Sequence, residues 1–200
     1  MRALALPLLV LASGCILAPA PHMPRLADAV VSSDFETYQL QRIGLLPFHG
    51  KPLSGTQGAD LQRAFHSELS QSTPYEIVLL DDNDLAELEA SDPHRRGWYK
   101  PRTIIGLSER YSLDAIVFGT VTQERFYPPQ LLSLQVDMVS AETGLVIWSS
   151  SVHLDASDQR VVDGLRLFYG SEEEDESWRV ALLSPERFAR FAAFQVACLL

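Results

Sequence analysis

The chain has 200 residues, of which 46% are hydrophobic and 21% are charged, a balance typical of a globular domain and not of a disordered chain. Twenty-six acidic residues outnumber sixteen basic ones, so the formal net charge is −10. A protein that binds nucleic acid needs a basic surface for the phosphates, and the sequence contains no cluster of Lys and Arg. The composition therefore predicts one modest globular domain and no nucleic-acid partner.

The N-terminus has the features of a lipoprotein signal. Arg2 precedes an uninterrupted apolar run of ten residues, 3–12, which is too short for the ~20-residue helix that spans a membrane. The segment Leu11–Cys15 (LASGC) resembles a bacterial lipobox, in which the cysteine thiol accepts a diacylglyceryl group. We predict that residues 1–14 are a cleaved signal peptide. Cys15 is then the lipidation site, with acyl chains such as palmitate holding the protein on the membrane.

An ordinary signal peptide cut after Ala20 is the alternative, but it would leave Pro21 as the first mature residue, a poor substrate for signal peptidase. The residue after Cys15 is Ile16. By resemblance to enterobacterial sorting, the absence of Asp at this position implies transfer to the outer membrane. Residues 15–35 are rich in proline near their start and show little periodicity, so they are predicted to be a lipidated flexible tether.

Residues 36–200 are predicted to form the folded domain. Short apolar or alternating runs indicate strands, and apolar residues three or four positions apart indicate helices. The predicted elements are strands at 41–48, 75–80, 113–128, 131–139 and 145–154 and helices at 58–71, 84–90, 102–111, 157–169 and 185–199. The order β-α-β-α-α-β-β-β-α-α predicts a single-domain α/β fold, with a mixed five-stranded sheet and helices packed on its faces.

Two segments near the C-terminus have alternative interpretations. The five consecutive carboxylates at 172–176 are predicted to be a solvated loop, because a calcium loop has alternating ligands and a glycine turn. Helix 185–199 has so few polar residues that it must be covered, either by the sheet of its own chain or by a protein partner or second subunit. Cys198, the second of two cysteines, is expected to be a buried structural thiol.

Three stretches carry a family resemblance. They are the first strand Ile43–Phe48, the run Leu113–Val121 (LDAIVFGTV) and the turn and strand Glu142–Trp148 (ETGLVIW). Together they resemble a superfamily of bacterial envelope lipoproteins that includes the curli-secretion lipoprotein CsgG, the TolB amino-terminal domain and the penicillin-binding-protein activator LpoB. The resemblance covers residues 41–155. It implies an α/β sandwich and a role in envelope assembly, and it supplies no catalytic residue.

Individual positions in these stretches have expected structural roles. Gly119 would allow close packing against the strand, and Gly144 would adopt a positive φ in the turn. Ser140 stands where the superfamily often has Asp, and its hydroxyl can cap the turn in the same way.

Known catalytic and metal-binding motifs are missing from the sequence, including Gly-x-Ser-x-Gly, His-Glu-x-x-His, the Walker loop and Cys-x-x-Cys. No catalytic, cofactor-binding or metal-binding residue is therefore predicted. One alternative is a small periplasmic hydrolase that uses His153 with Ser149 or Ser151, which share a strand face. A solvent-facing polar strand side explains the same residues more simply.

These observations predict a non-enzymatic lipoprotein without a cofactor, anchored to the outer membrane through lipid on Cys15 and facing the periplasm. It would act by protein–protein contact as an accessory in envelope assembly or transport. The contact, with an envelope protein or a second copy of the chain, would involve helix 185–199 if the sheet of its own chain, the first expectation, does not cover that helix.

Overall fold

The computed structural model describes residues 22–50, 52, 53, 55–89, 101–170, 176 and 178–200. The predicted signal peptide 1–14, the lipidation site Cys15 and all of the acidic run except Glu176 lie outside these residues. Within the described part, no helix combines the length and the apolar character that crossing a membrane requires.

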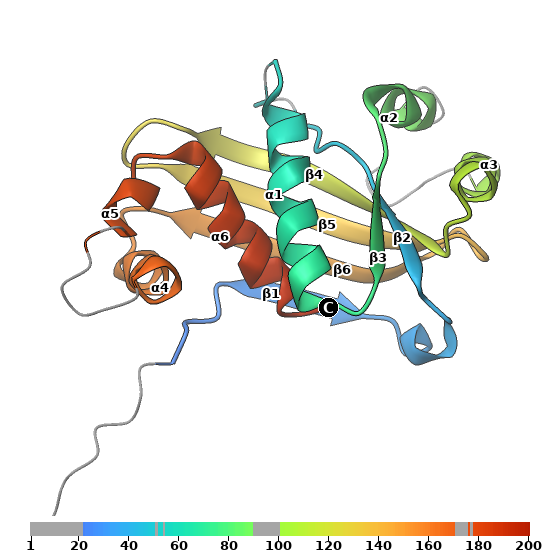
Figure 1. Cartoon of the computed structure of the whole chain (residues 1–200), viewed down its shortest axis with the longest axis horizontal. Helices are drawn as coiled ribbons and strands as arrows, with labels where there is room; N and C mark the ends of the chain where they lie inside the picture. Colours follow the sequence, from blue (N-terminus) through green and yellow to red (C-terminus); the bar gives the residue numbers. More distant parts are fainter. Residues whose placement is uncertain (1–21, 51, 54, 90–100, 171–175, 177) are drawn as a thin grey trace, which may run out of the picture.

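The domain is built on one mixed sheet of six strands in the order β1-β6-β5-β4-β2-β3 (Figure 1). Strand β2 pairs in parallel with β3 and with β4, and the remaining neighbours are antiparallel. The strands are β1 (Ala27–Val31), β2 (Arg42–Leu45), β3 (Glu76–Leu79), β4 (Ala115–Arg125), β5 (Leu131–Ser140) and β6 (Val146–Asp155). The helices are η1 (Phe35–Thr37, a 3-10 turn), α1 (Gln57–Ser72), α2 (Asp82–Glu89), α3 (Pro101–Tyr111), α4 (Gln159–Tyr169), α5 (Trp178–Ala181) and α6 (Pro185–Ala197).

The predicted mixed α/β sheet is confirmed, but the prediction of five strands is wrong. The sixth strand, β1, pairs antiparallel with β6 and lies within residues 15–35, where a tether was expected. Of its five residues only Ala27 is buried, because β1 is an edge strand with one neighbour. Without an alternating apolar pattern, the sequence of β1 carries no strand signal.

Helices pack on both faces of the sheet, as predicted. Helices α1 and α6 lie side by side across one face (Figure 1), over a core that includes Val117 of β4. The residues on either side of Val117, Ile116 and Phe118, point to the opposite face and pack with Ile104 of α3. The sheet therefore separates a large core from a smaller one.

The apolar side of α6 is covered by its own chain. Its buried residues include Phe188, Phe191 and Val196, and the helix packs on α1, β6 and β1. The indole Nε1 of Trp148 in β6 donates a hydrogen bond to the Leu199 carbonyl just after the helix, at 3.3 Å. The expectation that helix 185–199 packs on its own chain is therefore confirmed. The alternative, covering by a partner or second copy, is corrected, because that apolar surface is already buried.

Cys198 was expected to be buried, and this is wrong. It is the C-cap residue of α6 and is exposed, because the apolar stripe of the helix ends with Val196 and Ala197. Partial burial, with a smaller contribution from the Glu68 carboxylate, still raises the pKa of the Cys198 thiol. A raised pKa keeps the thiol protonated at neutral pH, so Cys198 is not an activated nucleophile.

Candidate functional site

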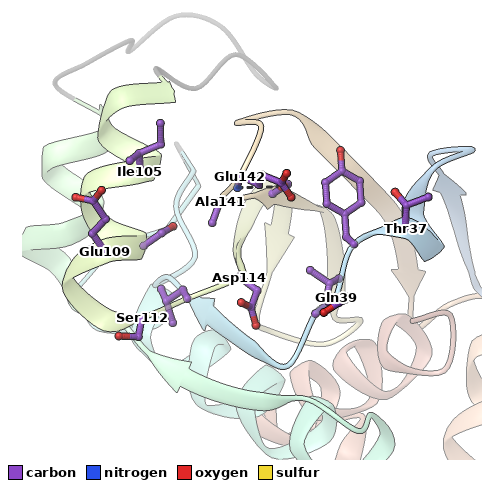
Figure 2. Close-up of a pocket in the computed structure, with 13 residues that line it drawn as sticks. Thr37, Gln39, Ile105, Glu109, Ser112, Asp114, Ala141 and Glu142 are labelled. Carbon is purple, nitrogen blue, oxygen red and sulfur yellow. Dashed lines mark hydrogen bonds between the residues drawn. The ribbon is translucent and has the colours of Figure 1, made fainter.

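A pocket of about 820 Å³ lies at one end of the sheet. Figure 2 shows α3 on one side of it and the segment Thr37–Leu40 on the other, with the β5–β6 turn closing a third side. These three walls come from distant parts of the sequence. The lining residues are Thr37, Tyr38, Gln39, Leu40, Ile105, Ser108, Glu109, Ser112, Leu113, Asp114, Ser140, Ala141 and Glu142.

The β5–β6 wall is a turn with local side-chain capping. Ser140 Oγ accepts hydrogen bonds from the backbone N–H groups of Glu142 and Thr143, at 3.1 and 3.3 Å. Gly144 has φ of 69°, a left-handed conformation that favours glycine. The expectations for Ser140 and Gly144 are both confirmed. The capped turn holds the backbone of Ala141 and Glu142 at the edge of the pocket.

Asp114 holds the start of β2, beside the Thr37–Leu40 wall, by hydrogen bonds. Its Oδ2 accepts hydrogen bonds from the backbone N–H groups of Gln41 and Arg42, at 2.9 and 2.8 Å. The carbonyl of Asp114 accepts a further bond from the Ala141 N–H at 2.9 Å. One residue thus joins the start of β2 to the β5–β6 turn by hydrogen bonds.

A buried carboxylate orients α3. The side chain of Asp84 in α2, only 3% exposed, accepts hydrogen bonds from Arg110 Nη1 at 2.9 Å and from the Tyr111 hydroxyl at 3.0 Å. The bond to Asp84 raises the pKa of Tyr111, since the neutral phenol is the donor. Because both donors lie at the end of α3, this cluster fixes the helix that supplies Ile105, Ser108 and Glu109 to the pocket.

The pocket is anionic. Its described lining residues include three carboxylates, on Glu109, Asp114 and Glu142, and no Lys, Arg or His. Glu109 and Glu142 are exposed, and neither forms an ion pair with a cation in the described part of the chain. The described lining residues thus carry negative charge only.

Ser108 belongs to the wall of this pocket, but its hydroxyl oxygen is buried behind the pocket surface. The residue is only 6% exposed, and its Oγ has no hydrogen-bond partner in the structure. Buried hydroxyls in proteins are normally paired, and leaving one unpaired costs about 1–3 kcal/mol. Helix α3 also presents Ile105 there with 39% of its surface exposed. The accessible surface of the site therefore combines anionic and apolar groups.

The residues of the hydrolase alternative are arranged differently from the prediction. His153 Nδ1 lies 2.5 Å from Ser133 Oγ, a residue on the neighbouring strand. Ser149 instead donates a hydrogen bond to Asp137 at 2.5 Å. The nearby Asp155 accepts from the Ser157 N–H at 2.8 Å, and this bond lowers its pKa. The structure does not bring His153 and Ser149 together, and neither residue lines the pocket.

The pocket residues carried no sequence signal of function. Glu109, Tyr38 and Glu142 are common surface residues, and only the fold brings them together. Ser133 was missed for a related reason, because its position opposite His153 depends on the β5–β6 register. Among the described residues, no group of three or more His, Cys, Asp or Glu side chains is arranged to hold a metal ion.

No protein-family model and no curated protein matches the sequence. Solved structures do show a distant likeness. They include the PelC dodecamer from Paraburkholderia phytofirmans, 7% identical with a TM-score of 0.48, covering 84% of this chain and 96% of that one. Lipoprotein GNA1162 from Neisseria meningitidis is 17% identical with a TM-score of 0.40, covering 57% of this chain and 79% of its own. The LpoB C-terminal domain from Escherichia coli is 11% identical with a TM-score of 0.40, covering 60% and 92%.

Proposed function

We propose that this chain is a lipoprotein anchored to the outer membrane through acyl groups on Cys15. Its α/β domain faces the periplasm and acts without catalysis, by binding another envelope protein as an accessory in envelope assembly or transport. The pocket between α3, Thr37–Leu40 and the β5–β6 turn is the proposed contact surface.

The observation that carries the anchor is the LASGC segment Leu11–Cys15 directly after a ten-residue apolar run. The position of the domain is compatible with it, since β1 begins at Ala27, twelve positions after Cys15. Twelve residues reach at most ~40 Å when fully extended. The domain would then work within a short distance of the membrane surface.

Two observations favour binding over catalysis. None of the described lining residues is His or Cys, the residues that most often activate a nucleophile or transfer a proton. The Ser133–His153 pair lies on β5 and β6 and does not line the pocket. A pocket whose described lining residues carry negative charge suits recognition of a partner's side chain.

The anchor is tested by the intact mass of the protein from a detergent-solubilised membrane fraction. We expect a chain that starts at Cys15 and carries diacylglyceryl and N-acyl groups. Cys15→Ser should lose this mass increment, and Cys198→Ser, the matched control, should keep it. An unmodified wild-type chain, or one cut at another position, would contradict the proposal.

The contact surface is tested by placing a photo-crosslinking amino acid at Thr37, an exposed residue of the pocket wall, in cells. A defined protein adduct is expected there. The same amino acid at Asp163, exposed on α4, should give none. Equal adducts from both positions would mean that the pocket is not the contact surface.

A further inference from the structure

We propose that the end of the sheet opposite the pocket is the membrane-facing surface of the domain, where Val180 and Leu183 insert into the interfacial region of the lipid bilayer. The inference rests on the proposed function, because it specifies how a lipid-anchored domain sits on its membrane. The course of the N-terminal segment, two exposed apolar side chains and the aromatic residues near them each support it.

The N-terminal segment is held at this end of the sheet. Arg160 Nη2, at the start of α4, donates a hydrogen bond to the Arg25 carbonyl at 3.0 Å. The next residue, Leu26, donates its N–H to Gln195 Oε1 in α6, also at 3.0 Å. The chain is thus fixed from Arg25, ten positions after Cys15, and ten residues reach at most ~35 Å when fully extended. A lipid on Cys15 would keep this end of the domain close to the membrane.

The strands separate this end from the pocket. Strands β5 and β6 have ten residues each, which makes them about 30 Å long at ~3.3 Å per residue. Strand β6 begins after the turn that lines the pocket and ends before α4. Figure 1 shows α4, α5 and the β4–β5 connection at one end of the sheet and α3 at the other. With the first end on the membrane, the pocket would open toward the periplasm and its protein partner.

Helix α5 and the turn after it present apolar side chains at the membrane-facing end. Val180 and Leu183 are 49% and 66% exposed. The Val180 carbonyl accepts hydrogen bonds from the N–H groups of Leu183 and Ser184, at 3.0 and 2.8 Å, so the two apolar residues belong to one hydrogen-bonded turn. Ala181 between them is fully buried and joins the turn to the large core. Because the turn is already ordered, little conformational entropy is lost when its side chains enter an interface.

Aromatic rings and guanidinium groups accompany this turn. The guanidinium carbons of Arg166 and Arg179 lie 4.9 and 5.6 Å from the centre of the Trp178 ring. Tyr127, in the β4–β5 connection at the same end, is 71% exposed. Trp and Tyr are enriched where a membrane meets water, and Arg side chains there bury their stems and direct the guanidinium toward lipid phosphates. The residue types at this end are those of a membrane-interface surface.

Apolar contact, and not net charge, is the expected driving force. The sequence places five consecutive carboxylates at 172–176 directly before α5, and one of them, Glu176, forms an ion pair with Arg179 at 2.9 Å. Binding through net positive charge is therefore not expected, and a zwitterionic bilayer should suffice.

The test uses the full chain from the detergent-solubilised membrane fraction, reconstituted into phosphatidylcholine vesicles. A polarity-sensitive fluorescent amino acid replaces Leu183. In the matched control it replaces Leu145, which is 63% exposed in the β5–β6 turn at the other end of the sheet. Quenching is measured with phosphatidylcholine that carries a spin label near its headgroup.

We expect about threefold or stronger quenching at Leu183 than at Leu145, because interfacial apolar side chains lie ~5–10 Å into the boundary between headgroups and acyl chains. Added phosphatidylglycerol should change this ratio little. Equal quenching at the two positions would overturn the inference. A Leu183 probe that stays unquenched on vesicles and crosslinks to a protein in cells would assign the surface to a protein partner instead, and would overturn it too.

A second measurement places the probe at Tyr127 and substitutes other positions. The variant combines Val180→Asn with Leu183→Asn, and the control combines Leu79→Asn with Leu145→Asn, two side chains of similar exposure at 46% and 63%. We expect quenching at Tyr127 to fall about twofold or more in the variant and to stay unchanged in the control. Equal changes would contradict insertion through Val180 and Leu183.

The outcome is separable from that of the anchor. The intact mass of the same preparation reports whether Cys15 is lipidated, whereas the comparison of Leu183 with Leu145 reports the orientation of the domain on the vesicle. Stronger quenching at Leu183 in a chain without lipid would support the membrane-facing surface while the anchor fails. A lipidated chain with equal quenching would leave the anchor in place and remove the membrane-facing surface.

Discussion

The carboxylate of Glu68 in α1 accepts a hydrogen bond from Nε of Arg190 in α6 at 2.5 Å. The Glu68 side chain is 5% exposed and that of Arg190 is 46% exposed, so the acid is buried and its cation lies at the surface. The bond raises the pKa of Arg190. It joins the two helices that cover the large core and supplies a partner to the buried Glu68 carboxylate.

Arg190→Met should therefore destabilise the protein by about 2 kcal/mol in urea unfolding. The change leaves the Glu68 carboxylate buried without its cation, and the expected cost is below that of a fully buried pair because Arg190 is half exposed. Arg63→Met, which removes an exposed ion pair with Asp60, is the control and should cost less than about 0.5 kcal/mol. Similar losses in both variants would show that burial of Glu68 is energetically unimportant.

Gln62 in α1 joins the helix to the ends of two parallel strands. Its Nε2 donates to the carbonyls of Leu45 and Leu80, both at 2.7 Å, and the residue is 6% exposed. Gln62→Leu should cost about 1–2 kcal/mol, because the Leu80 carbonyl loses the Gln62 donor and the Leu45 carbonyl keeps only the Leu80 N–H at 3.0 Å. Gln71→Leu, at an exposed position of the same helix, should change the unfolding free energy little. If Gln62→Leu left the free energy of unfolding unchanged, the burial of these two hydrogen bonds would not contribute to stability.

Gly119 in β4 is packed directly beneath the ring of Phe48. A Cβ at this position would overlap that ring, as the sequence-based expectation of close packing implies. Gly119→Ala should therefore destabilise the protein by about 2 kcal/mol through overpacking. Gly106→Ala is the matched control, since no atom lies within 4 Å of a Cβ there, and it should stabilise α3 by up to about 1 kcal/mol. Chemical denaturation of both variants tests whether Gly119→Ala lowers the free energy of unfolding while Gly106→Ala raises it.

Glu124 in β4 should make stability depend on pH. Its Oε2 is buried without a hydrogen-bond partner, and this burial raises the pKa of the Glu124 carboxyl. Because the folded-state pKa exceeds the unfolded-state pKa, the folded protein favours the protonated acid. This contribution to stability is fully present below the unfolded pKa and is lost as pH rises through the folded pKa.

Glu124→Gln has no carboxylate to bury, so its advantage over the wild type should grow from about pH 4 to about pH 7. Thermal unfolding of both proteins across this range measures the difference. Glu186→Gln is an exposed control on α6, and its stability should differ from that of the wild type by the same amount at every pH. A constant difference between Glu124→Gln and the wild type would contradict the assigned cause.

Much of the local structure is predictable from the sequence. The alternation of Leu132, Leu134, Val136 and Met138 predicts β5, and all four side chains lie in the large core. The capping Ser184, followed by proline, predicts the start of α6, where Ser184 Oγ accepts from the Arg187 N–H at 3.3 Å. These signals are reliable because they depend on residues within one or two turns of the chain.

The pocket is not predictable in this way. Tyr38, Ser108 and Glu142 are far apart in the chain, and the strand order and the packing of α3 bring them to one place. Strand β1 was missed for the same reason, since its five residues form a strand by pairing with β6. An edge strand needs little apolar sequence of its own when a neighbour supplies the hydrogen bonds.

The sequence by itself determined the charge of the protein, most of its helices and strands, the turn at Ser140–Gly144 and the predicted lipid anchor at Cys15. Each of these depends on composition or on neighbouring residues. Only the tertiary structure decided that α6 is covered by its own chain, that Glu68 meets Arg190, and that an anionic pocket opens beside α3. Such features depend on long-range packing, in which the energy of a contact is set by the residue that the fold places opposite.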